Sequence, residues 1–326
     1  MTLPPTHRSI AVVMDPLDGI DIQADTTFVL MLEAQRRGHR LFYVDPANLG
    51  VLDGRATARA RPVEVRREPG NHFELGPERL LTLDDDCDLV LQRKDPPVDA
   101  EYITATQILT LCRRALVLNR PASILSANEK LYACRWPELM AETLVTREIP
   151  KLVDFMAKLG GEMIVKPLAG RGGEGIFHVS NADRNLFSIL EQSTNFGTQR
   201  VMAQRYLPEV RTGDKRILLV DGEPIGALLR VPAAGETRSN LHVGGQPAQA
   251  SLDADDQRIV DALAPCLRED GLFFVGIDVI GGKLTEVNVT SPTGVQEINA
   301  IENACLEARI LDGIEALLDG NQGPRC

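Results

Sequence analysis

The stretch "MIVKPLAGRGGEGIFHV", residues 163–179, decides how this chain of 326 residues is interpreted. An apolar run ends at Lys166, four glycines follow within six residues, and a second apolar run begins at Ile176. Strand-like sequence on both sides predicts a glycine-rich hairpin instead of the strand-to-helix turn of a P-loop. Backbone N–H groups of glycine can surround phosphate oxygens at such a tip, and Lys166 adds a positive charge beside them. The glycines are Gly170, Gly172, Gly173 and Gly175.

A second stretch, "GIDVIGGKLTEVNVT", predicts a hairpin that binds a metal ion. A three-residue loop at 281–283 pairs Asp278 with Glu286 and places Asn288 on the same face, whereas a two-residue loop pairs Asp278 with Thr285. We predict the three-residue loop, because it brings both carboxylates and the amide together. Opposed carboxylates repel each other unless a cation lies between them, and an all-oxygen donor set suits Mg²⁺.

Positive charges accompany these two stretches in an otherwise acidic chain. Lys215 and Arg216 begin one predicted strand, Arg230 ends the next, and Arg238 lies in the polar segment that follows. Arginine suits the bidentate recognition of a carboxylate, so this group predicts an anionic second substrate. The polar segment, residues 231–246, is predicted to join a strand to a helix and to act as a lid, with an unstructured surface loop as the alternative.

Composition excludes several classes of protein. With 44% hydrophobic and 25% charged residues the chain is predicted to be globular, and a net charge of −11 argues against a nucleic-acid partner. The six cysteines form no C-x-x-C pair and the five histidines no H-x-x-x-H pair, so zinc and redox motifs are absent. No apolar run approaches the roughly 18 residues of a membrane span, and the N-terminal run is too short for a signal peptide, so we expect a cytoplasmic protein without membrane contact.

The order of elements predicts an α/β domain followed by a sheet-rich part. Strands at 10–14 and 40–44 flank a helix at 26–37, and the pattern repeats with strands near 88–92 and 115–119 around a helix at 101–114. This alternation predicts a doubly wound parallel sheet, and the missing G-x-G-x-x-G fingerprint argues against a dinucleotide-binding dehydrogenase. Residues 123–160 are predicted to be helical. From residue 161 onward, adjacent strands predict an antiparallel sheet covered by helices at 253–270 and 302–318.

Taken in order, several segments resemble prokaryotic glutathione synthetases of the ATP-grasp superfamily over nearly the whole chain. They are "NEKLYA", "IVKPLAGRGGEGIF", "MAQRYLP", "GDKRILLVDGEP", "GETRSNL" and "TEVNVTSPTG". The resemblance implies an N-terminal α/β domain (1–122), a central ATP-grasp domain (123–208) and a C-terminal ATP-grasp domain (209–326). It also implies a homo-oligomer, a dimer or a tetramer.

The reaction that the resemblance implies is the ATP-dependent ligation of γ-glutamylcysteine and glycine. Glutathione, ADP and phosphate are the products, and an acyl phosphate is the intermediate. Mg²⁺ is the implied metal ion, with Mn²⁺ as a substitute.

The resemblance also assigns roles to individual residues. Lys130 and Lys166 contact ATP phosphates, the segment from Gln204 through Arg205 and Tyr206 to Leu207 binds adenine, and Asp214 also binds the nucleotide. The assigned metal ligands are Asp278, Glu286 and Asn288. Arg216 and Arg238 are the implied catalytic residues, and the implied substrate-binding residues are Arg230, Asn240, Ser291 and Thr293.

Three positions depart from the pattern of the family. Ala169 and Arg171 occupy loop positions where a polar or small residue is expected, and Ser239 replaces a glycine. These three departures could alter the mobility of the loop and the affinity for the nucleotide without changing the reaction. Two other functions stay open on the sequence alone: an ATP-grasp ligase that joins a different carboxylate and amine, and an ATP-binding regulatory module without turnover.

Overall fold

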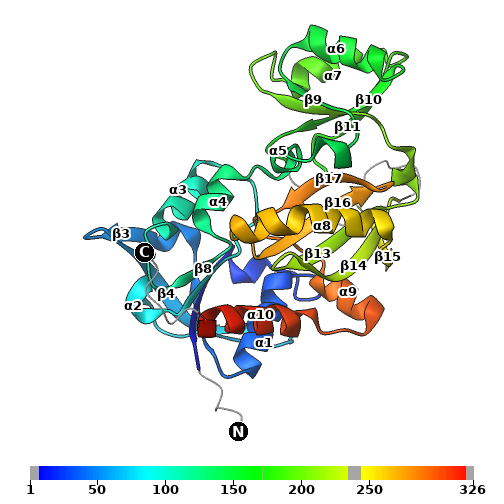
Figure 1. Cartoon of the computed structure of the whole chain (residues 1–326). Helices are drawn as coiled ribbons and strands as arrows, with labels where there is room; N and C mark the ends of the chain where they lie inside the picture. Colours follow the sequence, from blue (N-terminus) through cyan, green and yellow to red (C-terminus); the bar gives the residue numbers. More distant parts are fainter. Residues whose placement is uncertain (1–6, 171, 234–243, 321–326) are drawn as a thin grey trace.

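A computed structural model describes residues 7–170, 172–233 and 244–320 (Figure 1). It contains three β-sheets, one near the N-terminus, one in a small lobe at the top of Figure 1, and one between these two. Within the described residues, none of the helices has the length and apolar character needed to cross a membrane. The predicted domain limits at residues 122 and 208 remain a prediction.

The N-terminal sheet has a parallel centre, as predicted. Its strand order is β3-β4-β2-β1-β7-β8, and β2, β1, β7 and β8 are parallel. The parallel strands are β1 (Ser9–Val13), β2 (Arg40–Val44), β7 (Leu89–Gln92) and β8 (Leu116–Leu118). The helices of this part are α1 (Thr26–Arg36), α2 (Leu83–Asp86), α3 (Ala100–Leu109) and α4 (Pro121–Ser126).

An antiparallel extension of this sheet was not predicted. It consists of β3 (Leu49–Leu52), β4 (Arg55–Val65), β5 (Phe73–Leu75) and β6 (Arg79–Thr82). The buried face of β4 includes Ala56, Ala58 and Ala60, which alternate with polar residues. Alanine has a low β-propensity, so the alternation gives only a weak strand signal.

The small lobe contains a four-stranded antiparallel sheet with the order β11-β10-β12-β9. Helices α6 and α7 cover one face of it. The strands are β9 (Thr143–Thr146), β10 (Glu162–Pro167), β11 (Phe177–Ser180) and β12 (Val201–Gln204), and the helices are α6 (Ile149–Lys158) and α7 (Leu186–Ser193). The purely helical prediction for 123–160 is therefore wrong at β9, and α7 was not predicted. The short helix α5 (Glu129–Ala133) precedes the lobe and lies against β17.

The third sheet is antiparallel, as predicted, with the order β15-β14-β13-β16-β17. Its strands are β13 (Asp214–Val220), β14 (Glu223–Val231), β15 (Gln246–Gln249), β16 (Phe274–Ile280) and β17 (Lys283–Asn288). Its helices are α8 (Ala254–Glu269), α9 (Val295–Glu302) and α10 (Leu306–Gly320). The polar segment 231–246 leads into β15 and not directly into a helix, and its residues 234–243 lie outside the described part.

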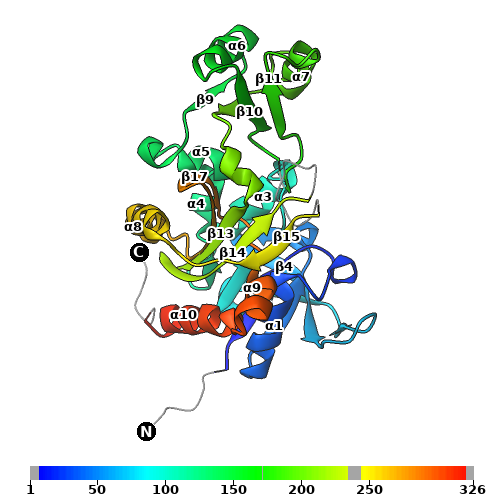
Figure 2. The same ribbon diagram turned by 90° about the vertical axis from the view of Figure 1, so that its right-hand side faces the viewer.

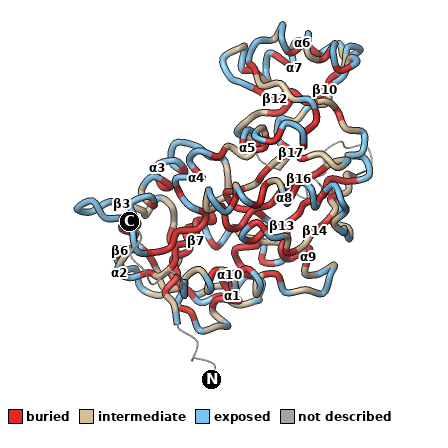
Figure 3. Tube along the Cα trace, in the orientation of Figure 1, coloured by how far each residue is buried: buried red, intermediate tan, exposed pale blue. Residues whose placement is uncertain are grey.

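Residues of β13 alternate between two apolar cores. Ile217 and Leu219 pack with α8, whereas Leu218 and Val220 pack with α9 and α10. The second of these cores also contains residues of α1, β1 and β7, so the N-terminal and C-terminal parts share one core. Figure 2 shows α1 and α10 side by side, and Figure 3 shows the buried chain concentrated in the two larger sheets.

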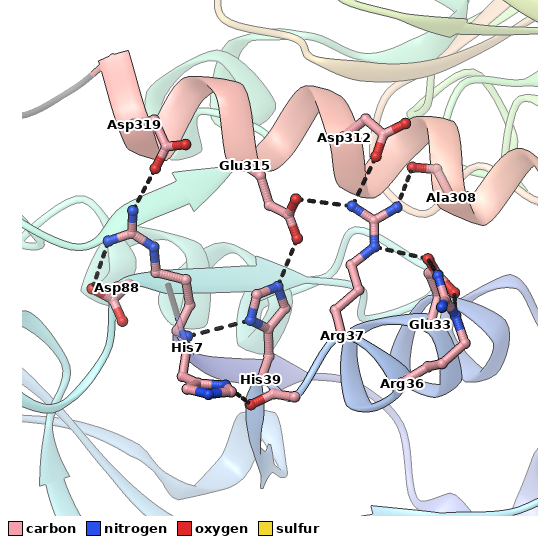
Figure 4. A network of polar contacts seen from close by, with 12 residues as sticks. His7, Glu33, Arg36, Arg37, His39, Asp88, Ala308, Asp312, Glu315 and Asp319 are labelled. Atoms are coloured by element: carbon pink, nitrogen blue, oxygen red, sulfur yellow. Dashed lines mark hydrogen bonds and ion pairs between the residues drawn. The ribbon is translucent and has the colours of Figure 1, made fainter. Parts of the chain in front are cut away.

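A polar network at the surface also joins α1 to α10 (Figure 4). The Arg37 guanidinium contacts Glu33 at 2.7 Å, Asp312 at 2.8 Å and Glu315 at 2.9 Å. His39 adds a contact of 2.9 Å to Glu315. Glu33 is buried, and the side chains of Arg36 and Arg37 hold the pKa of its carboxyl below the usual value against the opposing effect of burial.

We expect Arg37→Leu to lower the free energy of unfolding by about 2 kcal/mol, because a buried carboxylate loses a charged partner. Urea denaturation at pH 7 measures this loss. Arg36→Leu is the matched control, because Arg36 binds the same Glu33 but its side chain is 70% exposed. The control should be much less destabilised. Equal losses in the two variants would contradict the role of burial.

The loss should also depend on pH. Because the pKa of Glu33 is lowered in the folded state, its ion pairs stabilise the protein above the ordinary carboxyl pKa and cease to do so as the pH falls through the lowered value. The difference between wild type and Arg37→Leu should therefore shrink in acid.

Candidate active site

The turn of the β16–β17 hairpin differs from the prediction. Ile280 pairs with Lys283, so the loop consists of the two residues Gly281 and Gly282, and the predicted three-residue loop is wrong. Both glycines have positive φ, 55° and 70°. Two successive positive φ values match the twist of the flanking strands, which favours two-residue turns.

A β-bulge nevertheless produces the predicted pairing. Val279 is opposite Leu284, but Asp278 is opposite Glu286, so Thr285 is an additional residue in β17. This extra residue cancels the one-residue slip that the shorter turn introduces. The prediction that the two carboxylates lie directly opposite each other is confirmed.

Asp278 forms the centre of a buried charge cluster. Its Oδ1 accepts a hydrogen bond from Arg216 Nε at 2.5 Å, and its Oδ2 accepts from Arg216 Nη2 and Arg230 Nη2, each at 3.0 Å. Arg230 Nη2 also lies 2.5 Å from Asp214 Oδ2. These four side chains come from β13, β14 and β16, which are neighbours in one sheet, and all four are buried.

The cluster stabilises its own charges. Burial alone would raise the pKa of Asp278, but the positive charges of Arg216 and Arg230 outweigh burial and hold this pKa well below the usual value. Burial likewise favours loss of the Arg230 charge, and the carboxylates of Asp214 and Asp278 overcome it and raise the arginine pKa. Asp278 and Arg230 are therefore ionised at neutral pH.

Two lysines approach the hairpin from the other side. Lys130 of α5 places Nζ 2.9 Å from Glu286 Oε1 and donates to the carbonyl of Gly170 at 3.1 Å. Lys166 of β10 donates to the carbonyl of Thr285, the bulge residue, at 3.3 Å. Burial lowers the pKa of Lys166 to about 8, an effect that Glu286 opposes and Lys130 reinforces.

The glycine-rich segment connects β10 to β11 as a hairpin, which confirms that prediction. Gly172, Gly173 and Gly175 have φ values of 59°, 83° and 69°, which residues with a side chain rarely adopt. A Cβ on Gly170 would lie 2.8 Å from the ring of Pro167. Arg171 lies outside the described residues. The hairpin therefore needs glycine for both backbone conformation and space.

The predicted adenine-binding segment is anchored to β9. Gln204 donates to the Thr143 hydroxyl at 2.9 Å, and the Arg205 backbone N–H donates to the Glu142 carbonyl at 3.0 Å. The Tyr206 ring stacks on His178 with the ring centres 4.0 Å apart. Leu207 ends this segment. A pocket of about 300 Å³ adjoins it, lined by Cys134, Pro137, Met140, Ala141, Glu142, Thr143 and Val145.

The predicted substrate-binding turn follows β17. Ser291 donates from its hydroxyl to the carbonyl of Arg93 at 3.3 Å, and the Thr293 carbonyl accepts from Arg216 Nη1 at 3.3 Å. The turn therefore lies beside the Asp278 cluster. Arg238 and Asn240, which the sequence assigns to the same region, fall outside the described residues, as does Ser239.

Lys215 does not belong to this site, contrary to the grouping of cations predicted from sequence. Its ammonium group contacts Asp253 at 3.1 Å, Asp256, and the carbonyl of Ser251 at 3.1 Å, at the beginning of α8. Successive residues of a strand face opposite sides of a sheet, so Lys215 and Arg216 cannot both face the substrate.

The donor set fits a divalent cation. Asp278 and Glu286 supply carboxylate oxygens, and Asn288, opposite Gly276, supplies an amide on the same face. Within the described residues, Asp278 Oδ1 accepts one hydrogen bond and keeps a free lone pair, whereas Oδ2 accepts from both arginines and from Asn288 Nδ2 at 3.3 Å, which leaves the amide oxygen of Asn288 as its metal donor. The part of the chain that is described holds no group of three or more His, Cys, Asp or Glu residues suited to a metal ion. The candidate site thus depends on an amide and on ligands from a bound substrate.

Three residues near the site were not identified from the sequence. Asn119, Glu129 and Arg93 bind the chain from residue 289 to residue 292, immediately after the candidate metal ligands. Glu129 belongs to the quoted segment "NEKLYA", and Arg93 precedes Lys94 and two prolines, so the position of both residues could have suggested a role. No sequence pattern around Asn119 indicates one.

Comparison with known proteins identifies the family. Residues 9–124 match the family described as "Prokaryotic glutathione synthetase, N-terminal domain", and residues 129–303 match "Prokaryotic glutathione synthetase, ATP-grasp domain". The chain belongs to the prokaryotic glutathione synthetase family. Glutathione synthetase of Brucella melitensis is 45% identical over 310 residues, which are 94% of this chain and 98% of the relative. That of Salmonella typhimurium is 45% identical over 312 residues, 95% and 98% of the two chains.

Solved structures support the same fold. A D-cycloserine synthetase aligns with a TM-score of 0.65 at 16% identity, covering 95% of this chain and 99% of that one. D-alanine–D-alanine ligase of Bacillus anthracis complexed with ATP aligns with a TM-score of 0.56 at 15% identity, covering 95% and 97%. The family and the fold together identify the chain as an ADP-forming ligase that synthesises glutathione and uses ATP and a divalent metal ion.

The lowered pKa of Lys166 predicts how nucleotide binding varies with pH. The protonated lysine attracts phosphate, so ATP affinity should fall as the pH rises through about 8 and the lysine loses its proton. Calorimetric titration with ATP between pH 6.5 and 9.5 measures the effect. Lys166→Arg should bind ATP without this dependence, because guanidinium stays charged. A wild-type affinity that is constant from pH 7 to 9.5 would rule out the low pKa.

Proposed function

We propose that the enzyme joins the cysteinyl carboxylate of γ-glutamylcysteine to the amine of glycine, with the candidate site as the place of phosphoryl transfer. The observation that carries this proposal is the convergence of Lys130 and Lys166 on the Asp278–Glu286 hairpin, where Lys130 Nζ lies 2.9 Å from Glu286. Phosphoryl transfer depends mainly on positioning and charge neutralisation, and this arrangement offers both.

Nucleotide binding is assigned to the small lobe and the strands below it. Lys130 and Lys166 contact the ATP phosphates, and the backbone of Gly170, Gly172, Gly173 and Gly175 surrounds them. The segment of Gln204, Arg205, Tyr206 and Leu207 binds the adenine base, and Asp214 orients Arg230 beside the nucleotide. The Arg205 N–H is already bonded to Glu142, which leaves base recognition to the other backbone groups of the segment.

Mg²⁺, or Mn²⁺ as a substitute, is held by Asp278, Glu286 and Asn288. A bound divalent ion supplies neutralisation of phosphate charge. Residues of the chain position these ligands: Arg216 and Arg230 fix the carboxylate of Asp278, and Lys130 fixes that of Glu286.

The arginines are assigned to the anionic substrate. Arg216 and Arg230 stabilise negative charge on the acyl phosphate, since a guanidinium has five N–H donors and those bound to Asp278 are only some of them. Arg238 and Asn240 complete the substrate site, and Ser291 and Thr293 shape the turn at its edge. The glycine amine then attacks the acyl carbon and phosphate leaves.

The enzyme is further proposed to be cytoplasmic and a dimer or tetramer. The described cysteines, Cys87, Cys112, Cys134, Cys266 and Cys305, are free thiols, as expected in a reducing compartment. Sedimentation equilibrium over a range of concentrations distinguishes the two assemblies from a monomer.

An omission assay tests the reaction. ADP and glutathione are measured with ATP, Mg²⁺, γ-glutamylcysteine and glycine, and each component is left out in turn. Equal amounts of ADP and glutathione, formed only when both γ-glutamylcysteine and glycine are present, support the proposal. Faster turnover with another carboxylate and amine would show that γ-glutamylcysteine and glycine are not the natural substrates. Binding of ATP without any ligation would contradict the activity.

Glu286→Gln tests the metal assignment. We expect kcat to fall by at least about 100-fold while the melting temperature stays close to that of wild type, because the carboxylate contributes to metal charge neutralisation more than to the core. Glu223→Gln is the control, since Glu223 lies in the same sheet but pairs with Arg268 at the surface. Near-normal kcat in Glu286→Gln would exclude Glu286 as a ligand.

A further inference from the structure

The segment 289–293 follows the last candidate metal ligand, Asn288, and is held by side chains from distant parts of the chain. Asn119 and Arg93 come from the ends of β8 and β7 in the N-terminal sheet, and Glu129 comes from α5. Each of them is more than 150 residues away from the segment in sequence. The path of the chain beyond β17 is therefore determined by other elements as well as by its own sheet.

Asn119 binds three backbone groups in two separate segments of the chain. Its Nδ2 donates to the carbonyls of Phe274 and Val289, each at 2.8 Å, and its Oδ1 accepts from the Phe274 N–H at 2.9 Å. The side chain is 5% exposed. One amide thus fixes the beginning of β16 and the end of β17, the two strands that carry Asp278, Glu286 and Asn288.

Glu129 binds the same segment at residues 289 and 290. Its Oε1 accepts from the backbone N–H of Val289 at 3.1 Å, the backbone N–H of Thr290 at 3.3 Å and the Thr290 hydroxyl at 2.9 Å. The adjacent residue in α5 is Lys130, which contacts Glu286. Two consecutive side chains of one short helix therefore hold β17 on both sides of Asn288.

Arg93 completes the arrangement. Its guanidinium is buried and donates to the Pro292 carbonyl at 2.9 Å, and its own carbonyl accepts from the Ser291 hydroxyl. Nε donates to the Thr27 hydroxyl at 3.1 Å. The turn that borders the substrate site is therefore attached to the carboxyl edge of the N-terminal sheet.

We propose that Asn119 and Glu129 are positioning residues that hold β17 in the place where Glu286 and Asn288 can bind the metal ion. This inference rests on the proposed function for its link to catalysis. Neither residue contacts the ligand groups themselves. Asn119 acts through the backbone of Phe274 and Val289, and Glu129 acts through the backbone N–H groups of residues 289 and 290 and the Thr290 hydroxyl. Loss of their hydrogen bonds lets β17 shift, and a shift of a few tenths of an ångström is enough to weaken metal coordination and phosphate alignment.

The test compares two buried amides. Asn119→Asp keeps the shape and the acceptor for Phe274 but removes both N–H donors, so two buried carbonyls face a carboxylate. Gln296→Glu makes the same chemical change at the control position. Gln296 is 9% exposed, donates to the carbonyls of Ile22 and Asp25, and also joins distant parts of the chain without touching β17.

Three quantities are measured for each variant: the melting temperature, the dissociation constant of Mn²⁺ in the presence of ADP by electron paramagnetic resonance, and kcat as a function of Mg²⁺. Asn119→Asp should weaken Mn²⁺ binding and lower kcat by about 10- to 100-fold, the range typical of residues that orient metal ligands. Gln296→Glu should lose a similar number of degrees in melting temperature but change the other two quantities by less than about twofold.

Glu129→Met is the second variant and decides the question if Asn119→Asp does not fold. It keeps the approximate length of the side chain but removes the acceptor of three hydrogen bonds, so metal binding should weaken by about 10-fold. Mn²⁺ binding that is unchanged in Glu129→Met, or equally altered in Asn119→Asp and Gln296→Glu, would overturn the proposal. A wild type that binds Mn²⁺ but makes no glutathione would instead refute the proposed function, and the Mn²⁺ comparison would still decide the positioning role.

Discussion

The buried pairing of Asp278 with Arg216 and Arg230 is the interaction on which the rest of the site depends. Moving a carboxylate out of water costs several kcal/mol, and only well-placed opposite charges and hydrogen bonds offset this cost. Arg216 is directly opposite Asp278 in the paired strands β13 and β16, and Arg230 is opposite Asp214 in β13 and β14. Strand register therefore sets the charge arrangement. A shift in either pairing would leave buried charges without partners.

The small lobe packs around a core of its own and contacts the β16–β17 hairpin beside this cluster. The core of the small lobe contains only residues between 144 and 203, whereas the N-terminal sheet, α10 and the C-terminal sheet share another core. Of the two lysines, only Lys166 of β10 reaches the β16–β17 hairpin from the lobe, whereas Lys130 lies in α5, whose Tyr132 and Ala133 pack in the core of the C-terminal sheet. Displacing the lobe would therefore expose little apolar surface, and the contacts it would break are ones that phosphate and water can replace.

The sequence predicted those features that repeat locally. Alternation in "IDVI" and "TEVNV" indicates a sheet face with polar residues, and glycines between two strands predict the hairpin that follows β10. The pairing of Asp278 with Glu286 was predicted from a three-residue loop, so the pairing is correct although the loop is wrong. The bulge at Thr285 could not be predicted, because nothing in the local sequence marks it. It moves the register of β17 by one residue and so compensates for a turn that is one residue shorter than predicted. The strands β3 to β6 were missed since alanine and arginine alternate in β4, and β9 was missed because four residues between helices give too short a pattern. Lys215 was wrongly assigned to the substrate site because it was grouped with its neighbour Arg216. Adjacent residues of a strand face opposite sides of the sheet, so only one of the two can face the site.

Asn119 and Glu129 show a further limit of prediction from sequence, which comes from the kind of group that these side chains bind. Motifs assign roles to side chains that could touch a ligand, but these two bind mainly backbone N–H and C=O groups, which nearly every residue has. The Thr290 hydroxyl is their one side-chain partner in the described part of the chain. Nothing in the sequence of 289–290 marks it as their partner. The bulge acts in the same way, since it aims the carbonyl of Thr285 at Lys166 without requiring a particular side chain there. Backbone groups thus connect the β16–β17 hairpin to both the N-terminal sheet and Lys166. The precision of the site is therefore a property of the folded backbone, to which the conspicuous motifs contribute only the reacting side chains.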